Sequence, residues 1–437
     1  MKNIKFVFAS FALALFATNY SSAQAPDVPV PAPQQQGKIY LTNATIHVGN
    51  GKVLQNATIG FENGKITFLE ENPSIKTDAT MGKVIDCTGK QIYPGIIATN
   101  TIVGLSEIEA VRATNDNAEV GTFNPNVRSI VSYNTDSRVT PTLRSNGVLY
   151  AQVAPQGGLI SGTSGVVQLD AWNWEDAAVK QEDGLFINWP SMFRRKGWWA
   201  EPSGFELNKD YDKQVADLKD YFKDAKSYFE VGAHEKTNLG FEAMKGLFDK
   251  SKSVYVSVNY VKEMLHVIAF AEELGINIVL VEAKDSYMIA DVLAQKKIPV
   301  ILSKCHDLPT YDDEDIQQPY KTPGMLQKAG VLYCISIGAF WQERNLMFEA
   351  GTASAYGLTK EEALEAITYN PAKIMKLDNQ IGTLEKGKEA SLIISNGDLL
   401  DMKTSKIEQA FISGRQIDLS NKQKALNEKF SKKYGVN

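Results

Sequence analysis

The stretch SVYVSVNYVKEMLHVIAFAEELGINIVLVE, residues 253–282, decides the fold class. It opens with an apolar run, residues 253–259, and closes with a second one, residues 276–282. Runs of this kind are typical of parallel strands that are buried on both faces. Between them, residues 260–275 carry apolar side chains at helical spacing and end on a glycine, which is a helix stop signal. The stretch therefore predicts a strand, a helix and a second, parallel strand.

The same pattern recurs on both sides of this unit. Other apolar runs lie at residues 91–98, 147–154, 298–304 and 330–336, and other helical patterns at residues 285–297 and 359–375. Strands that alternate with helices over about 290 residues predict an α/β fold of the TIM type, a (β/α)8 barrel. The alternative is an open, doubly wound sheet. Its nucleotide-binding forms lose support, because the chain has neither GxGxxG after a first strand nor GxxxxGK[ST].

Both ends of the chain differ from this middle part. Apolar and polar side chains alternate in the N-terminal segment, where Gly49-Asn50-Gly51 and Asn63-Gly64 mark hairpins. The C-terminal segment has the same texture, so we expect one small composite β-sandwich domain built from both termini. The expected borders are residues 38–90 and 381–420 for the sandwich, 91–380 for the barrel and 421–437 for a C-terminal tail.

An insertion in the barrel is expected from residue 172 to about residue 248. It begins with clustered tryptophans and continues as a charged helical segment, residues 206–232. Indole rings beside two arginines suit a subunit interface or a ligand cleft. The competing explanation is that the rings pack the insertion onto the barrel. The candidate partner surface consists of Trp189, Arg194, Arg195, Trp198 and Trp199.

Residues 1–23 are expected to be a signal peptide. Two lysines precede an apolar run, residues 6–17, that is too short to span a bilayer, and Ser21-Ser22-Ala23 suits a cleavage site. An uncleaved anchor is the competing explanation, which the lack of a longer apolar span disfavours. Residues 24–37, rich in Pro and Gln, predict an extended linker. We therefore expect a secreted, periplasmic protein with no membrane span after signal removal.

Charge and cysteine usage narrow the class of partner. A net charge of −5 without a run of like charge argues against nucleic acid and against an anionic membrane as partners. Cys87, Cys305 and Cys334 lack CxxC spacing, so they predict neither a disulfide framework nor a cysteine zinc site. Cys334 lies in an apolar run and is expected to be a buried thiol.

Four segments carry a recognisable pattern: LTNATIHVGNGKVLQNATIGFENGKI, QIYPGIIAT, QGGLISGTSGVVQLD and AGTASAYGLTKEEALEAITYNPAKIMKLDNQIGTLEKGKEASLII, the last being the most specific. Together they resemble the amidohydrolase superfamily, most closely its imidazolonepropionase-like branch, over residues 38–419. The resemblance implies a barrel that carries a composite β-sandwich. It also implies a hydrolase whose divalent metal is held by an HxH pair after the first strand, by histidines after two middle strands and by an aspartate after the last.

The positions that match these metal ligands carry other residues. They are, in chain order, Asn100, Ile102, Ser257, Glu282, and either Ile337 or Gly338. Imidazoles and a carboxylate hold the cation that activates water in such enzymes, and an isoleucine offers no donor atom. We therefore expect no metal cofactor; a divalent metal is expected only if the chain is an active hydrolase.

The four histidines of the chain do not restore a metal site. His47, His234 and His266 fall in a terminal hairpin, the insertion and the middle of a helix, and no two histidines have HxH, HxxH or HxxxH spacing. His306 follows a barrel strand and is the only one expected at the catalytic face. A single histidine does not make a transition-metal site.

The candidate pocket lies at the carboxyl ends of the strands, where ligands bind in this fold. It consists of Asn100, Ser257, Glu282, Lys304 and His306. A buried, unpaired Glu282 would be costly, so we expect the Lys304 ammonium to take the place of the missing cation. The competing explanation is that Lys304 points to solvent. No catalytic residue is assigned, because Cys305 and His306 are chain neighbours that point in different directions.

Two hypotheses of function follow. The first is an exported amidohydrolase-fold protein that lacks the metal site and binds a partner, which is an active amidohydrolase relative or a second copy of itself, or a small-molecule ligand. The alternative is an active hydrolase of carbon–nitrogen bonds other than peptide bonds, with amide or cyclic amide substrates. Fold analogy alone does not establish activity, so enzymatic function is left open.

Overall fold

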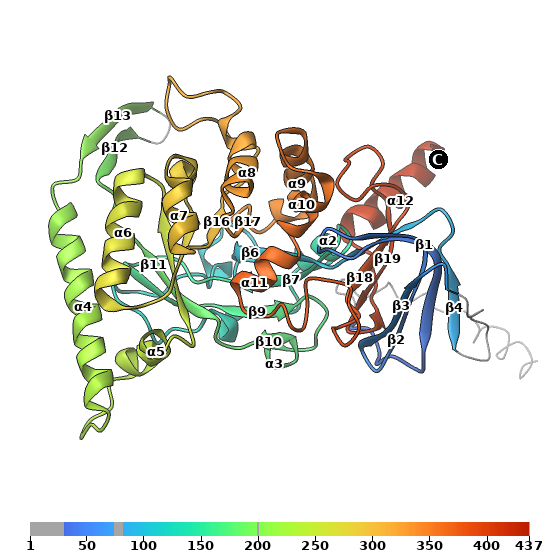
Figure 1. The fold of residues 1–437 in the computed structure, drawn as a ribbon, viewed down its shortest axis with the longest axis horizontal. Coiled ribbons are helices and arrows are strands. Elements are labelled where there is room, and N and C mark those ends of the chain that lie inside the picture. The colour runs from blue at the N-terminus through green and yellow to red at the C-terminus, as the bar shows by residue number, and fades with distance from the viewer. Residues whose placement is uncertain (1–29, 74–81, 199–200, 437) are drawn as a thin grey trace, which may run out of the picture.

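The structure, a computed structural model, describes residues 30–73, 82–198 and 201–436. A body of strands and helices fills the left and middle of Figure 1, and a smaller sheet stands at its right. The expected signal peptide, and residues 24–29 of the expected linker, lie outside the described residues. None of the described helices combines the length and the apolar composition that crossing a bilayer requires.

Strands from both ends of the chain form one eight-stranded sheet. They are β1 (Ile39–His47), β2 (Val53–Glu62), β3 (Lys65–Glu71), β4 (Lys83–Asp86), β5 (Gln91–Pro94), β18 (Leu392–Ser395), β19 (Ile407–Ile412) and β20 (Arg415–Gln416). β5 joins the two ends, because it pairs with β1 in parallel and with β18 in antiparallel. Leu392 and Phe411 belong to a core within this sheet, whereas Ile393 and Ile412 belong to the core of the body. The sandwich and its domain borders stay a prediction.

The run at residues 91–98, predicted as the first barrel strand, divides between two sheets. β5 ends at Pro94, and β6 (Ile96–Thr101) begins after Gly95 in a sheet of the body. Gly95 permits a close approach to β7 (Val148–Val153), because an added β-carbon would lie 2.7 Å from Leu149 Cδ1. The chain thus passes from the sheet of β5 to the sheet of β6 at Pro94, which lacks an N–H donor, and Gly95, which lacks a side chain.

The body contains a four-stranded sheet, β10-β9-β7-β6, and a six-stranded sheet, β17-β16-β15-β14-β11-β8. The strands not yet given are β8 (Ile160–Thr163), β9 (Gly165–Gln168), β10 (Ala178–Lys180), β11 (Gly184–Asn188), β14 (Ser253–Val258), β15 (Ile278–Glu282), β16 (Val300–Leu302) and β17 (Tyr333–Ile335). In the six-stranded sheet β11, β14, β15, β16 and β17 pair in parallel, whereas β8 and β9 run antiparallel to β11 and β7. The α/β fold is confirmed. In the described residues the two sheets are not joined into a closed ladder, and the Ser336 hydroxyl instead donates to the Thr99 carbonyl of β6 at 2.7 Å.

The unit at residues 253–282 folds as predicted. β14, α6 (Val261–Leu274) and β15 follow one another, and the two strands pair in parallel. α6 buries Met264, Phe270 and other apolar residues against the body. It ends at Gly275, whose φ of 70° is the left-handed conformation that a glycine stop supplies.

The two other helical patterns are each broken. Residues 359–375 form α10 (Lys360–Glu365) and α11 (Tyr369–Ile374), because Pro371 in a continuous helix would lack an N–H and clash with the Ile367 carbonyl. Residues 285–297 form a 3-10 turn, η3 (Lys284–Ile289), and α7 (Ala290–Lys296). The remaining helices and 3-10 turns are η1 (Arg112–Thr114), η2 (Ser129–Ser132), α2 (Thr140–Arg144), α3 (Trp174–Ala177), α4 (Tyr211–Val231), α5 (Leu239–Phe248), α8 (Gln318–Ala329), η4 (Gln342–Asn345), α9 (Leu346–Ala355) and α12 (Lys422–Tyr434).

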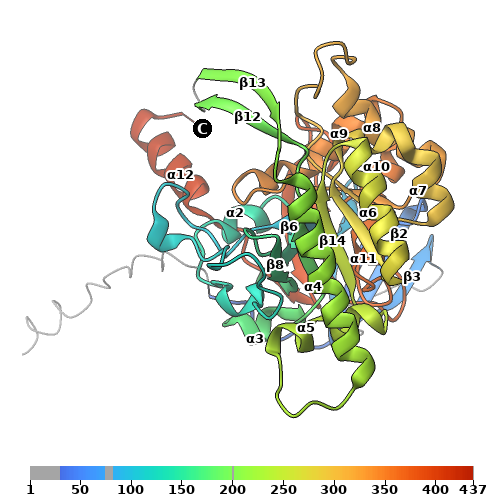
Figure 2. The ribbon, with the colours of Figure 1, turned by 90° about the vertical axis from the view of Figure 1, so that its left-hand side faces the viewer.

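The segment predicted as an insertion is partly built into the body. It contains β11, which lies between β14 and β8 in the six-stranded sheet. The part that projects is the antiparallel hairpin β12 (Phe193–Trp198) and β13 (Glu201–Leu207), at the top of Figure 1 and Figure 2. The early part of the expected insertion thus belongs to the body, because β10 and β11 are strands of its two sheets, and the borders of the insertion stay a prediction.

Residues 30–37 of the expected linker have no helix or strand, yet they are held in place. The Ala32 N–H donates to the Asp170 carboxylate at 2.9 Å, and its carbonyl accepts from Arg415 at 3.0 Å. The buried Asp170 also forms ion pairs with Arg144 and Arg415. This described part of the linker is docked onto the protein rather than free.

Candidate functional site

Asn100 lies at the end of β6, at the predicted place, and is half-buried. Its φ of 50° is left-handed, and its N–H donates to the Gln152 side chain at 3.1 Å. A β-carbon on Gly338 would lie 3.7 Å from the Asn100 side-chain nitrogen. The hydroxyl of Thr101 also donates to the Ala339 carbonyl. The positions that match the HxH pair and the aspartate are therefore adjacent in space, although more than two hundred residues separate them.

The direction of each strand residue separates Ser257 from Glu282. Tyr255, Val279 and Val281 share one interior cluster, and side chains on a strand alternate between its faces. Ser257 therefore continues the interior row of β14. Glu282 faces the opposite way on β15, and its carboxylate accepts from the Asn259 amide at 2.7 Å. Glu282 therefore lies at the predicted edge of the sheet, but its side chain does not point into the interior.

Lys304 does not pair with Glu282. The Lys304 ammonium lies 3.7 Å from one oxygen of Asp307, and the Lys284 ammonium lies 3.1 Å from the other. Burial raises the pKa of the Asp307 carboxyl, but the hydrogen bond and charge of Lys284, with the charge of Lys304, leave it below its usual value. The predicted Lys304–Glu282 pair is therefore wrong, because an acid three residues further along the chain takes this lysine.

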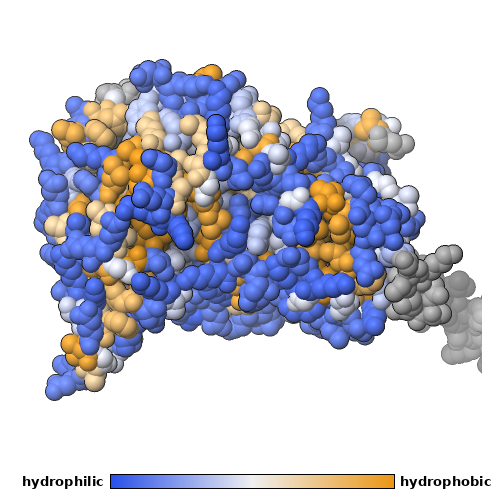
Figure 3. All heavy atoms as spheres, viewed as in Figure 1, coloured by the Kyte–Doolittle hydropathy of each residue, from blue (hydrophilic) through white to orange (hydrophobic). Residues whose placement is uncertain are grey.

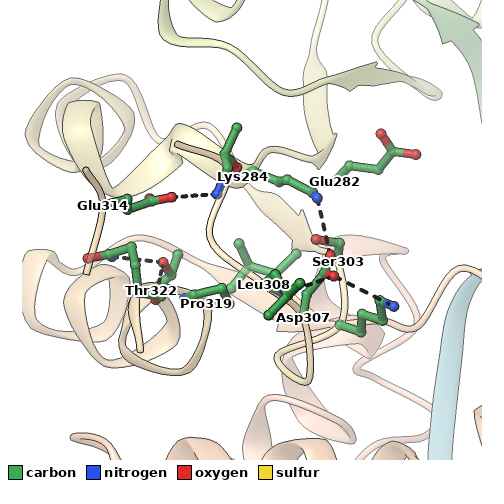
Figure 4. A pocket seen from close by; sticks show the side chains of 12 residues that line it. Glu282, Lys284, Ser303, Asp307, Leu308, Glu314, Pro319 and Thr322 are labelled. Atoms are coloured by element: carbon green, nitrogen blue, oxygen red, sulfur yellow. Dashed lines mark hydrogen bonds and ion pairs between the residues drawn. The ribbon is translucent and has the colours of Figure 1, made fainter. Parts of the chain in front are cut away.

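These charged groups border a small open hollow with a cavity volume of about 30 Å³, room for about one water molecule. Figure 4 shows Lys284 directed to Asp307, while the carboxylate of Glu282 points away from both. Glu314 closes the far side, where it accepts from the Thr310 N–H at 2.6 Å. The hollow lies between the ends of β15 and β16 and the start of α8, and combines apolar with charged walls.

His306 turns toward α9 and away from the interior. Its Nε2 lies 2.6 Å from the Thr352 hydroxyl, and its Nδ1 lies 3.1 Å from the Glu349 carboxylate. The neighbouring Cys305 is buried, which raises the pKa of its thiol far above the usual value. The predicted pocket role of His306 is therefore wrong in this structure, and Cys305 is not activated as a nucleophile.

A buried polar network that the sequence pattern did not reveal lies under Asn100. Gln152 accepts from the Asn100 N–H and donates to the Asp183 carboxylate at 2.8 Å. Asp183 also accepts from Tyr255 and from Lys180, each at 2.6 Å. Lys180 and Asp183 are therefore the ion pair beneath the strand ends. Both come from the segment between β9 and β11, where no motif marks them.

Glu343, on η4, is a second residue that sequence reasoning missed. It is fully buried, and neither carboxyl oxygen has a hydrogen-bond partner within the described residues. Burial, together with the charge of nearby Glu349, raises the pKa of this carboxyl to about 8. This buried carboxyl lies near Thr101, the residue between Asn100 and Ile102. Nothing in its spacing distinguishes it from a surface glutamate.

The candidate partner surface is only partly exposed. Trp189 is buried: it packs against Phe270, and its indole N–H donates to the Tyr211 hydroxyl at 3.3 Å. Its prediction as a surface residue is therefore wrong. Arg194 is exposed and pairs with Asp210 at 2.9 Å. Arg195 and Trp198 lie in β12 with side chains that are not described, and Trp199 lies outside the described residues.

The residues at the strand ends do not fit a divalent metal. Ile102 has no donor atom, and the Glu282 carboxylate is engaged by the Asn259 amide. Across residues 30–73, 82–198 and 201–436, no three His, Cys, Asp or Glu side chains are grouped so that they could hold a metal ion. The site offers amide, hydroxyl and neutral carboxyl groups, which suit hydrogen bonding rather than activation of water.

Comparison with known proteins agrees with this fold. A family model described as the amidohydrolase family matches residues 310–417. An amidohydrolase from Thermotoga maritima MSB8 is 25% identical, with a TM-score of 0.74 over 87% of this chain and 99% of that one. No curated protein matches the chain.

More distant solved structures share the fold alone. A prolidase complexed with N-methylphosphonate-L-proline is 13% identical, with a TM-score of 0.55 over 87% of this chain and 99% of its own. Molinate hydrolase is 14% identical, with a TM-score of 0.54 over 88% and 95%. These neighbours imply a barrel of the TIM type. A family model over residues 310–417 and many solved amidohydrolase structures thus resemble this chain, which agrees with the resemblance that its sequence motifs indicated.

Proposed function

We propose that this protein is a non-catalytic member of the amidohydrolase superfamily that binds a ligand or a partner. One observation carries the proposal: the positions that match the metal ligands hold residues that cannot form the family's metal site. Without that cation, no group at the strand ends is placed to lower the pKa of water or to polarise a carbonyl. The proposal therefore separates the fold of this chain from the chemistry of its relatives.

The proposed ligand site is the hollow bordered by Glu282, Lys284 and Asp307. Its charged groups beside apolar surface support a small polar ligand, because such sites combine apolar surface with a few placed polar groups. The proposed protein partner is an active amidohydrolase relative or a second copy. Exposed Phe205 and Leu207 of the projecting hairpin support that part. The proposed location is the periplasm, after removal of the signal peptide.

The alternative is an active hydrolase of carbon–nitrogen bonds in amides or cyclic amides. It is favoured by the identity of 25% to an amidohydrolase over most of both chains. Such an enzyme needs a metal-activated water or a substitute for it. The two hypotheses therefore differ in a property that can be measured directly, the metal content of the purified protein.

The test loads the purified chain with zinc, iron or manganese, removes free metal and measures bound metal by mass spectrometry. The same samples are assayed for hydrolysis of N-acyl amino acids and cyclic amides, beside a metal-dependent hydrolase as positive control. We expect well under one metal per chain and no turnover. A metal content near one per chain, with turnover that a chelator abolishes, would establish the alternative.

A further inference from the structure

Helix α12 carries an apolar stripe that nothing in the described structure covers. Leu426, Phe430 and Tyr434 lie four residues apart, which places them on one side of the helix. Their exposed fractions are 40%, 45% and 67%. No residue of α12 is buried, so the stripe faces solvent along its whole length.

The same helix concentrates positive charge. It contains five lysines and one glutamate, a net charge of +4 in a chain whose net charge is −5. Lys432 pairs with Glu428 at 2.8 Å, whereas Lys422, Lys429 and Lys433 form no ion pair within the described residues. The ammonium groups of Lys429 and Lys433 lie 5.9 and 4.9 Å from the ring centres of their neighbours Phe430 and Tyr434. Positive charge thus borders the stripe itself.

Only the first turn of α12 is attached to the protein. Asn421 caps the helix and donates to the Ser145 hydroxyl at 2.8 Å, while Gln423 accepts from the Thr142 hydroxyl at 3.1 Å. The rest projects from the body in both Figure 1 and Figure 2. A helix of 13 residues is marginal in water without an apolar contact, so a surface that covers the stripe would stabilise it.

We propose that α12 is a membrane-surface helix that binds an anionic lipid bilayer. Its apolar stripe would lie among the acyl chains and its lysines at the anionic headgroups, with Tyr434 at the boundary. Complementary charge selects this occupant, because α12 has a net charge of +4 whereas the net charge of the rest of the chain is −9. The low net charge that argued against a membrane partner conceals this local separation of charge.

The experiment uses the chain from Gln24, so that the apolar run at residues 6–17 cannot account for binding. It is sedimented with vesicles of phosphatidylcholine alone or with added phosphatidylglycerol. We expect binding only to the anionic vesicles, and its loss at about 1 M salt, where charges are screened over a few ångströms. Binding to neither vesicle, or equally to both, would overturn the proposal.

Three variants locate the binding surface. Replacing Lys422, Lys429 and Lys433 by Gln is expected to weaken binding about a hundredfold, since each lysine near an anionic surface contributes roughly fivefold. Replacing the stripe residues Leu426, Phe430 and Tyr434 by Ser is expected to abolish it. The matched control replaces Lys213, Lys219 and Lys223 of α4, another exposed helix, and is expected to bind normally.

Folding is not at risk in these variants, because no replaced residue of α12 is buried; circular dichroism checks this. Unchanged binding by the α12 variants would overturn the proposal. So would light scattering that shows a dimer of the parent chain that the stripe variant loses, because a second copy would then be the occupant.

Discussion

At the scale of single residues, Glu343 is a carboxyl whose pKa in the folded protein differs from that of an exposed glutamate. Its carboxyl has an ordinary pKa of 4.5, and burial raises this to about 8 in the folded protein. Between these values the folded state keeps a proton that the unfolded chain releases. The folded protein therefore loses stability as the pH rises through this window.

Replacing Glu343 by Gln tests this, because the amide cannot release a proton. Between pH 4.5 and about 8 we expect the parent free energy of unfolding to fall relative to that of Glu343→Gln. The expected slope of this difference is up to about 1.4 kcal/mol per pH unit. Urea unfolding at a series of pH values measures it, with Glu230→Gln on the exposed face of α4 as control. Parallel pH profiles for parent and variant would contradict the burial argument.

Single residues also show how much of the candidate site the sequence predicts. Asn100 and Ser257 lie at the ends of β6 and β14, where the aligned motifs placed them along the chain, and their role in a pocket stays a prediction. Glu282 and Lys304 lie where a strand ends and the backbone leaves the extended conformation; the φ of Glu282 is 68°. The direction in which such a side chain points depends on tertiary packing and not on strand alternation. His306 was drawn to α9 by Glu349, an acid 43 residues away that no local pattern connects to it.

At the scale of elements, α10 depends on its first residue. The Thr359 hydroxyl accepts from the Glu362 N–H at 3.2 Å, and Glu362 accepts in return from the Thr359 N–H at 2.7 Å. This capping box satisfies two backbone groups that the first turn leaves unpaired. Because α10 has only six residues, a lost cap affects much of the helix.

Thr359→Ala is expected to lower the free energy of unfolding by about 1 kcal/mol, and Thr359→Ser to leave it nearly unchanged. The threonine is exposed, so neither change opens a cavity. Chemical denaturation of the three proteins under one condition measures the difference. Equal losses for Ala and Ser would show that packing of the methyl group matters instead of the cap.

The sequence predicted elements well where a helical apolar pattern extends over many residues. It predicted them poorly where one apolar run is divided between strands of two sheets. α6 is specified by its own apolar spacing and its glycine stop. The run at residues 91–98 reads as one strand, yet Pro94 and Gly95 divide it between two sheets. That division depends on Ser391 and Gly147, which bond to the two residues after Pro94 and lie far away in the sequence.

At the scale of the whole molecule, the sheet from both termini and the body share their cores. Adjacent residues of β18 point to opposite faces, so that Leu392 packs within the sheet and Ile393 with the body. The sequence predicted that both ends combine, since they share one texture. It could not predict that β18 is buried on both faces, because that depends on the docking of the body against this strand.

Phe411 tests whether this shared core makes one cooperative unit. It is fully buried and meets Phe61 of β2 edge to face, with ring centres 5.3 Å apart. Phe411→Ala is expected to cost about 3–5 kcal/mol of unfolding free energy, through lost apolar contact and the cavity it leaves. Tryptophan fluorescence reports on the body, where Trp189 is buried, and far-UV circular dichroism reports on all elements. We expect both signals to shift together in a single transition at lower denaturant.

A chain that stops at Ser420 is the control. It lacks α12, none of whose residues is buried, and its free energy of unfolding should lie within about 0.5 kcal/mol of the parent value. Two separated transitions in Phe411→Ala would mean that the sheet unfolds alone, and that the faces joined by Leu392 and Ile393 do not couple it to the body.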